Sequence, residues 1–287
     1  MKRSKSTFNT FSERLVLPIG RRPQSGRSDK ELSKSHSPLS FALLSSVLLS
    51  FVLNGAITVA NTSAVYGASI NVQVYVDEEE PATAAQWKAR LGKRLQRAST
   101  VFDRYGILRF RVVSYGRWKS DNREQDLSRS LSEFEQQVQP NRSAIAIGFT
   151  SQYRFSPGRH QLGGTRGPLH SHILIRENNP RAVEMERLEL LVHELGHFLG
   201  AVHTDQVGSV MRPVLTSRQP RDRLKIEFDP ENARIIRLFG EEVSNLKVRR
   251  ASQLTDDTKE KLHQVYRQIQ QRMPNDPTVE FYLNLIE

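Results

Sequence analysis

The sequence predicts an α/β or α+β fold in which a mixed, mostly parallel sheet is followed by a C-terminal helical hairpin. Between residues 69 and 176, short apolar segments typical of strands alternate with longer segments of helical periodicity. Such alternation favours parallel pairing, because each helix returns the chain to the edge where the next strand begins. After residue 250, two more helical segments flank the break Pro274-Asn275-Asp276-Pro277, and this pattern predicts the hairpin.

The predicted strands are short segments rich in β-branched and other apolar residues. They span 69–77, 107–114, 144–149 and 170–176. The predicted helices repeat apolar residues every three or four positions. They span 81–105, 126–139, a segment that begins at 180 or 181, 229–240, 255–273 and 279–286. The Gly- and Arg-rich segment 158–168 is expected to be a loop.

One stretch, LVHELGHFLGAVH, contains the pattern HExxHxxGxxH, formed by His193, Glu194, His197, Gly200 and His203. His193 and His197 are four residues apart, so on a helix both imidazoles lie on one face and can bind the same metal ion. Gly200 tolerates a positive φ angle, so it can end the helix and bring His203 back as a third ligand. Three protein ligands leave a position for water, which is typical of catalytic zinc sites.

Glu194 adjoins the first of these histidines and is expected to act as a general base, not as a ligand. From that position it can accept a proton from a water molecule held on the metal. Two other interpretations stay open: the histidines could share a helix by coincidence, or the metal site could have lost its activity. The presence of the carboxylate argues against the second.

The pattern and the methionine that follows it, Met211, resemble the metzincin clan of zinc metalloendopeptidases, most closely its compact bacterial, secreted members. The resemblance implies a twisted, mixed sheet with an active-site helix, one catalytic Zn²⁺ ion and a peptide or protein substrate. It implies hydrolysis by a zinc-bound water that Glu194 activates, a turn at Gly200 and an apolar floor at Met211. The zinc ligands that it implies are His193, His197 and His203.

In the metzincins, the strand just before the active-site helix is a sheet edge to which a peptide substrate pairs as an added strand. The resemblance therefore implies that 171–176 is the substrate edge, with Ile173, Leu174 and Ile175 in contact with the peptide. His170 and His172 lie at the start of this segment. They could bind a second metal or the substrate, or they could be ordinary loop and strand histidines.

Two features of this sequence exclude properties that some metzincins have. Pro213 stands where some branches of the clan carry a tyrosine that can also bind zinc, so no tyrosine ligand is expected there. The chain contains no cysteine, which excludes both disulfides and a latent form in which a cysteine caps the zinc.

The N-terminal residues 1–37 are polar and hold nine Lys or Arg against three Asp or Glu, so they supply +6 of the net charge of +11. Their richness in Ser, Pro and Gly predicts a disordered tail. Because the rest of the chain carries only +5, and no basic run is interleaved with aromatic residues there, nucleic-acid binding is not expected.

The segment 38–64 follows this tail and is rich in Leu, Val and Phe. It could be a cleaved signal peptide, or its apolar part, 39–60, could be retained as a membrane anchor. Because the basic flank is N-terminal, both interpretations place the following domain outside the cytoplasm, either secreted or periplasmic, or anchored.

Two folded parts are expected after this segment. The first is a zinc protease domain at 69–240, and the second is a helical extension at 251–287. The extension resembles a single tetratricopeptide-type hairpin, which needs a neighbour to bury its apolar face, so it is expected to pack on the domain or on a partner. The alternative function is a catalytically inactive zinc-binding interaction protein tethered at the membrane; the oligomeric state is left open.

Overall fold

The computed structural model describes residues 68–105, 108–152, 161–177, 182–213, 225–245 and 247–287. The predicted tail and the predicted signal or anchor segment lie outside the described residues, as do the expected starts of the active-site helix at 180 or 181. Within the described ranges, no helix has both the length and the apolar character that crossing a membrane requires.

The described strands are β1 (Ala68–Val76), β2 (Leu108–Arg117), β3 (Ala144–Thr150), β4 (Gly163–Thr165) and β5 (His172–Arg176). The described helices are α1 (Ala84–Asp103), α2 (Leu127–Gln137), α3 (Glu184–Phe198), α4 (Pro230–Asn245), α5 (Asp256–Arg272) and α6 (Pro277–Ile286), with a short 3-10 helix, η1 (Ala251–Gln253). The predicted helix that ended at Gly240 is longer than expected, because Gly240 is buried inside α4 and the helix continues for five residues.

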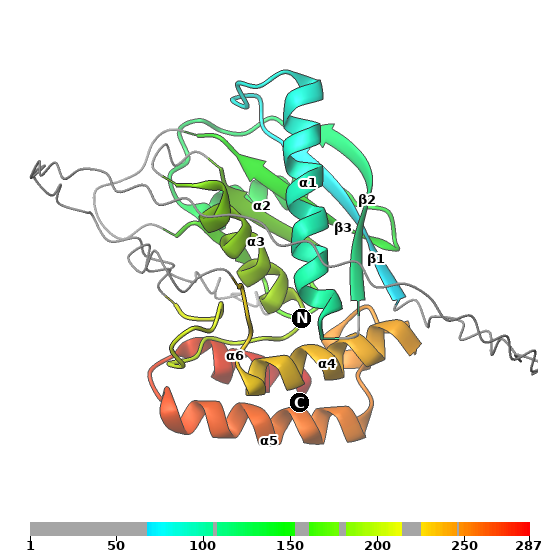
Figure 1. Ribbon diagram of the computed structural model, residues 1–287, viewed down its shortest axis with the longest axis vertical. Coiled ribbons are helices and arrows are strands. Elements are labelled where there is room, and N and C mark those ends of the chain that lie inside the picture. Colours follow the sequence, from blue (N-terminus) through cyan, green and yellow to red (C-terminus); the bar gives the residue numbers. More distant parts are fainter. Residues whose placement is uncertain (1–67, 106–107, 153–160, 178–181, 214–224, 246) are drawn as a thin grey trace, which may run out of the picture. The chain divides into compact units, whose positions relative to one another are not determined.

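The five strands form one mixed, mostly parallel sheet in the order β2-β1-β3-β5-β4, which confirms the predicted fold class. Only β4 is antiparallel to its neighbour. Helix α1 packs on β2 and on α3, and α2 packs on β4 and β5 (Figure 1). The core is divided accordingly: Ile147 and Ile173 point to the core shared with α1 and α3, and Leu174 points to the core shared with α2.

Strand β4 corrects the sequence interpretation in two ways. Residues 163–165 were expected to be loop, because a Gly-Gly-Thr sequence has no strand signal of its own; pairing with β5 makes them a strand. As a result, 171–176 is not a sheet edge. Ile173 pairs with Ile147 of β3 on one side and with Thr165 of β4 on the other.

The prediction that Ile173, Leu174 and Ile175 contact a substrate is therefore wrong. Their side chains are 0%, 0% and 1% exposed, and they alternate between the two cores. Their backbone lies between two paired strands, so it has no side on which a peptide could add a further strand.

The C-terminal hairpin packs on the preceding domain. Helices α5 and α6 contact each other, α5 contacts α4, and α6 contacts η1 (Figure 1). Tyr266 and Tyr282 belong to the same apolar core as Leu195 and Phe239. Of the two predicted possibilities, packing against the domain is thus confirmed, and a partner protein is not needed to bury this face.

A buried arginine joins α1 to the start of α3. The guanidinium of Arg94 lies 2.7 Å from the Glu177 carboxylate and 2.8 Å from the Glu184 carboxylate, and its side chain is 0% exposed. Burial acts to lower the pKa of Arg94, but the hydrogen bonds that its guanidinium donates to Glu184 and Glu177, together with the negative charges of these carboxylates, outweigh burial and raise it. The arginine thus stays charged and fixes the segment from which the motif helix begins.

A buried carboxyl group at the end of β1 makes the stability of the protein depend on pH. Asp77 is 0% exposed, and its Oδ2 accepts a hydrogen bond of 2.7 Å from the N–H of Ser151. Burial raises the pKa of Asp77 to about 7; hydrogen bonds from Thr150 and Ser151 oppose this effect, and the nearby Glu79 and Glu78 add to it.

We expect Asp77→Asn to stabilise the protein relative to the wild type, by an amount that grows with pH. The folded state holds the Asp77 proton more tightly than the unfolded state, so ionisation disfavours folding as the pH rises from about 4 through about 7. Above pH 7 the difference should reach the order of 2–4 kcal/mol. Urea unfolding of both proteins from pH 4 to 8 measures it; a difference that does not change with pH would contradict the assignment.

Candidate active site

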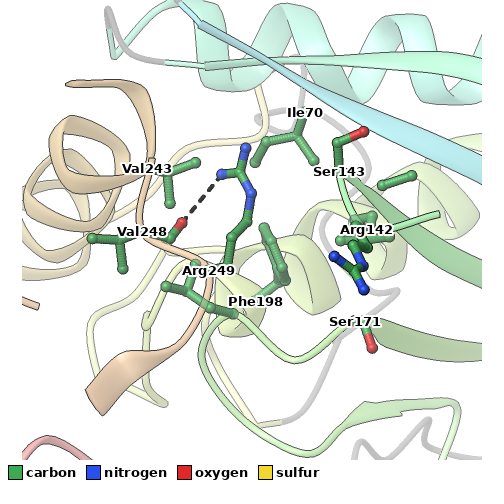
Figure 2. A pocket seen from close by; sticks show the side chains of 11 residues that line it. Ile70, Arg142, Ser143, Ser171, Phe198, Val243, Val248 and Arg249 are labelled. Atoms are coloured by element: carbon green, nitrogen blue, oxygen red, sulfur yellow. Dashed lines mark hydrogen bonds between the residues drawn. The ribbon is translucent and has the colours of Figure 1, made fainter. Parts of the chain in front are cut away.

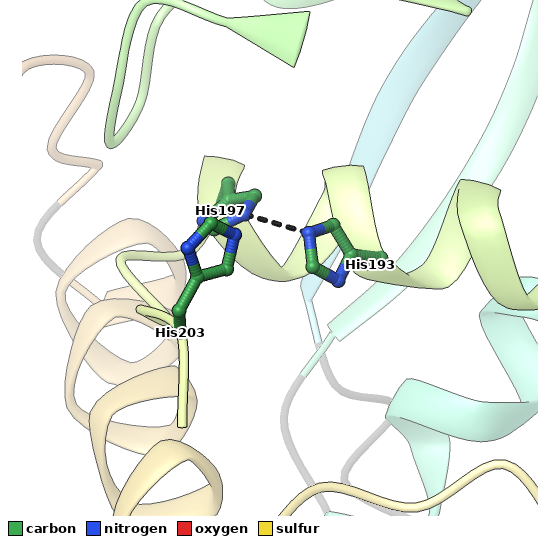
Figure 3. A group of neighbouring side chains, drawn as sticks. All are labelled: His193, His197 and His203. Atoms are coloured by element: carbon green, nitrogen blue, oxygen red, sulfur yellow. Dashed lines mark hydrogen bonds between the residues drawn. The ribbon is translucent and has the colours of Figure 1, made fainter. Parts of the chain in front are cut away.

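The three histidines of the motif are buried, and their rings point toward one another (Figure 3). His193 and His197 lie one turn apart on α3, and His203 faces them from the segment after the helix. The Nε2 atoms of His193 and His197 are 2.9 Å apart, and the His203 ring centroid lies 5.4 Å and 5.1 Å from the other two centroids. One nitrogen from each ring lies within 4.8 Å of the others, so the three can share a metal ion.

Hydrogen bonds on the far side of each ring set the tautomers. Nδ1 of His193 lies 2.8 Å from the carbonyl oxygen of Val210, and Nδ1 of His197 lies 2.8 Å from that of Ala201. A carbonyl can only accept, so both Nδ1 atoms carry the proton and both Nε2 atoms present a lone pair to the shared centre.

This arrangement fits a metal cation. Two lone pairs 2.9 Å apart repel each other unless a proton or a cation lies between them. The pKa of His193 is lowered well below its usual range, first by burial and then by the neighbouring imidazoles of His197 and His203. A proton shared between the two Nε2 atoms is therefore disfavoured, and a metal cation is favoured in its place. Neutral imidazole nitrogen is the form that binds zinc and similar ions.

The turn after α3 has the predicted form. Gly200 has a φ angle of +79°, and its N–H donates to the carbonyl of His197 at 3.0 Å. A Cβ atom at this position would lie 2.1 Å from the Phe239 ring of α4. Both the backbone angle and the close approach of α4 require glycine.

Met211 is fully buried in a turn that contacts the motif helix. Its Sδ lies 2.8 Å from the place that a Cβ on Gly196 would occupy, and its carbonyl accepts from the N–H of Thr204 at 3.1 Å. The hydroxyl of Ser209, two residues earlier, donates to the Asp229 carboxylate at 2.7 Å. The turn is thus joined to α3, to the segment after it and to the N-terminus of α4.

The Glu194 side chain lies between the motif helix and β4. It is 1% exposed, and its carboxylate packs directly against Gly163: a Cβ atom on Gly163 would lie 2.4 Å from Oε1. A glycine at this point in β4 is what allows the carboxylate to occupy its position. The motif did not indicate Gly163, because nothing in the local pattern of 158–168 shows that it would meet α3.

On the peptide substrate that the metzincin resemblance implies, we expect Gly163→Ala to lower kcat about 10²-fold while metal affinity changes little, because the three atoms nearest to the added methyl all belong to the Glu194 side chain. The matched control is Gly164→Ala, whose Cβ would point to Gln161 and Leu127 instead, so its effect should be much smaller. Kinetics on a peptide substrate, together with metal analysis, measure both variants. Equal losses in the two variants would contradict the role of Gly163.

The other histidine pair does not form a comparable site. Glu135, His170 and His172 have ligand atoms within 4.8 Å of one another, but Arg166 holds both Glu135 oxygens at 2.7 and 2.8 Å. Both ring nitrogens of His172 are also engaged, with the Ser171 hydroxyl and the Val138 carbonyl. A metal would have to displace these partners, so this cluster is structural.

A separate cavity lies apart from the three histidines (Figure 2). It has a volume of about 90 Å³ and is lined by Ile70, Arg142, Phe198, Val243 and Arg249 among others; none of the three motif histidines lines it. Pockets for small ligands are usually several times larger, about 300–1,000 Å³. We regard it as a packing gap between the sheet and the segment that follows α4.

Three residues of the C-terminal hairpin contact residues of the histidine site. The HExxHxxGxxH pattern did not indicate any of them. The Nδ1 of His203 lies 2.8 Å from Oδ2 of Asp276. Burial acts to raise the pKa of Asp276, but the hydrogen bonds from His203 and Thr278 hold it at about 2. The Tyr266 hydroxyl donates to the Gly200 carbonyl at 2.7 Å, and the Tyr282 ring lies 6.4 Å from the His197 ring.

Three buried histidines beside a buried carboxylate, on and after a helix that contacts a mixed sheet, are the arrangement that metal-dependent hydrolases use. Residues 115–240 match the family model described as Matrixin. The match contains the whole motif and the Met211 turn, and it confirms the predicted resemblance to the metzincin zinc metalloproteases. The search of curated proteins found no match to the chain.

Solved structures of similar arrangement include archaemetzincin from Methanopyrus kandleri. It is 15% identical, with a TM-score of 0.42, over 58% of this chain and 94% of that one. A chaperone–substrate complex is 12% identical, with a TM-score of 0.40, over 62% of this chain and 35% of that one.

Proposed function

We propose that this chain is a zinc-dependent endopeptidase. The observation that carries the proposal is the convergence of His193, His197 and His203 around one buried point, with the Glu194 carboxylate on the same helix. The match to the matrixin family supports a metalloprotease, and the three imidazoles and their tautomers favour Zn²⁺ as the ion.

In this proposal the three histidines hold the ion, and Glu194 moves the proton. A zinc ion in such a site supplies Lewis-acid activation of water and of a peptide carbonyl. Glu194 accepts the proton of the attacking water and returns it to the leaving amine. Gly163 and β4 keep the carboxylate in place, and the buried surroundings of the site exclude bulk water from it.

Among the described strands, β4 and not β5 is the sheet edge next to the motif helix. A peptide that adds a strand to the sheet there would therefore pair with the outer side of β4. This strand passes directly over Glu194, so a peptide aligned with it would lie beside the catalytic carboxylate. The β4 residues are buried in the structure, so the pairing needs this edge to become accessible.

The test is digestion of a peptide library by the purified 287-residue chain, with metal analysis of the same sample. We expect cleavage that a chelator stops and that added Zn²⁺ restores. Bound zinc without cleavage of any peptide would favour the alternative, an inactive zinc-binding interaction protein.

The proposal includes an extracytoplasmic location, supported by the apolar segment 38–64 after a basic tail. N-terminal sequencing of the mature protein distinguishes a cleaved signal peptide from a retained anchor. A mature chain that begins at Met1 and fractionates with the cytoplasm would contradict both.

A further inference from the structure

We propose that Asp276 is a positioning residue for the metal site, so that the α5–α6 hairpin is part of that site; this inference rests on the proposed zinc site. The Nδ1 atoms of His193 and His197 are held by backbone carbonyls, whereas that of His203 is held by the Asp276 carboxylate at 2.8 Å. The side chains of His203 and Asp276 are 5% and 9% exposed, so water competes little for this hydrogen bond.

The carboxylate does for His203 what the helix does for the other two ligands. His193 and His197 are fixed by the backbone of α3, but His203 lies beyond the Gly200 turn, outside any helix or strand. By accepting the Nδ1 proton, Asp276 fixes the tautomer and the rotation of the ring, and it makes Nε2 a stronger donor to the metal.

Asp276 is itself held in place, because each of its oxygens has a separate role. Oδ2 accepts from His203, and Oδ1 accepts from the N–H of Thr278 at 2.9 Å and so caps the N-terminus of α6. The backbone N–H of Asp276 donates to the carbonyl of Met273 at 3.1 Å, which closes the turn between the helices. The carboxylate cannot swing away from His203 without uncapping α6.

Two tyrosines of the hairpin contact the second histidine and the turn that follows it. Tyr266 of α5 donates to the carbonyl of Gly200, and Tyr282 of α6 packs beside the His197 ring. The two tyrosine rings lie 6.2 Å apart, and they are 0% and 1% exposed. All three hairpin residues lie beyond residue 240, where the family match ends, so the matched part of the chain does not supply this support.

The test compares the zinc affinity of the 287-residue chain and its variants by competition with a chromophoric chelator. We expect Asp276→Ala to weaken zinc binding about 10–100-fold, and to change the visible absorption spectrum of the Co²⁺-substituted protein, because the His203 ring is no longer oriented. Asp276→Asn should weaken binding less, since its amide oxygen can still accept the Nδ1 proton.

The matched control is Thr255→Ala in the same hairpin. Thr255 caps α5 by accepting from the N–H of Thr258, so its loss should cost about 1 kcal/mol of stability. The zinc affinity and the Co²⁺ spectrum of this variant should remain those of the wild type.

The outcomes separate the two proposals. Wild-type affinity and a wild-type Co²⁺ spectrum in Asp276→Ala would overturn the role of Asp276 and leave the zinc site intact. An equal loss of affinity in Thr255→Ala would also overturn it, because general loosening of the hairpin would then explain both variants. Failure of the wild type to bind zinc better than His203→Ala would instead refute the proposed function. If Asp276→Ala does not fold, Asp276→Asn takes its place with a smaller expected loss of affinity, and wild-type affinity together with a wild-type Co²⁺ spectrum in that variant would overturn the role of Asp276.

Discussion

Glu194→Gln is expected to bind zinc as the wild type does and to lose kcat by about 10²–10⁴-fold. Glutamine has the size of glutamate, so it fills the buried space beside Gly163. It cannot accept a proton from water, and it cannot deliver one to the leaving amine. Because the three histidines are unchanged, the loss should fall on the chemical step and not on the metal.

Steady-state kinetics on a peptide substrate, with zinc quantified in the same preparations, measure this effect. Glu186→Gln is the matched control: Glu186 lies in the first turn of α3, and its carboxylate accepts from the N–H of Val183, which a glutamine oxygen can also do. This control should keep its activity. Activity in Glu194→Gln near that of the control would show that another group is the base.

The second large effect is expected for Gly200→Ala, on stability. An alanine at the φ angle of +79° is strained by about 1–2 kcal/mol. Its Cβ would also overlap the Phe239 ring, which adds about 1–3 kcal/mol as in other overpacked cores. The turn would have to shift, so the path to His203 and the zinc affinity should suffer as well.

Gly208→Ala separates the two causes. Gly208 has a φ angle of +94°, but a Cβ there would meet no atom within 4 Å. Urea unfolding of the metal-free proteins should therefore show a loss of about 1–2 kcal/mol for Gly208→Ala, from the backbone angle alone. Gly200→Ala should lose more, by the cost of the overlap with the Phe239 ring. Equal losses would mean that the approach of α4 to the turn is unimportant.

The sequence by itself determined the local chemistry. His193, Glu194 and His197 follow one another on a helix, and a helix fixes which side chains share a face. The angle at Gly200 and the N-terminal caps of α5 and α6 are also local, because a few neighbouring residues decide them. The alternation of strands and helices was enough to predict a mostly parallel sheet.

Only the tertiary structure decided which distant segments meet the motif. β4 has no strand signal, and its pairing with β5 moved the sheet edge away from 171–176. Arg94 lies in a helix with many exposed charges, and only the folded chain shows that it is buried and paired with two carboxylates distant in the sequence. Asp276 occupies a typical cap position, and the cap alone gives no reason to expect His203 at its second oxygen. Such contacts join residues many positions apart, so no local spacing encodes them, and the packing of the sheet and the hairpin on α3 determines them.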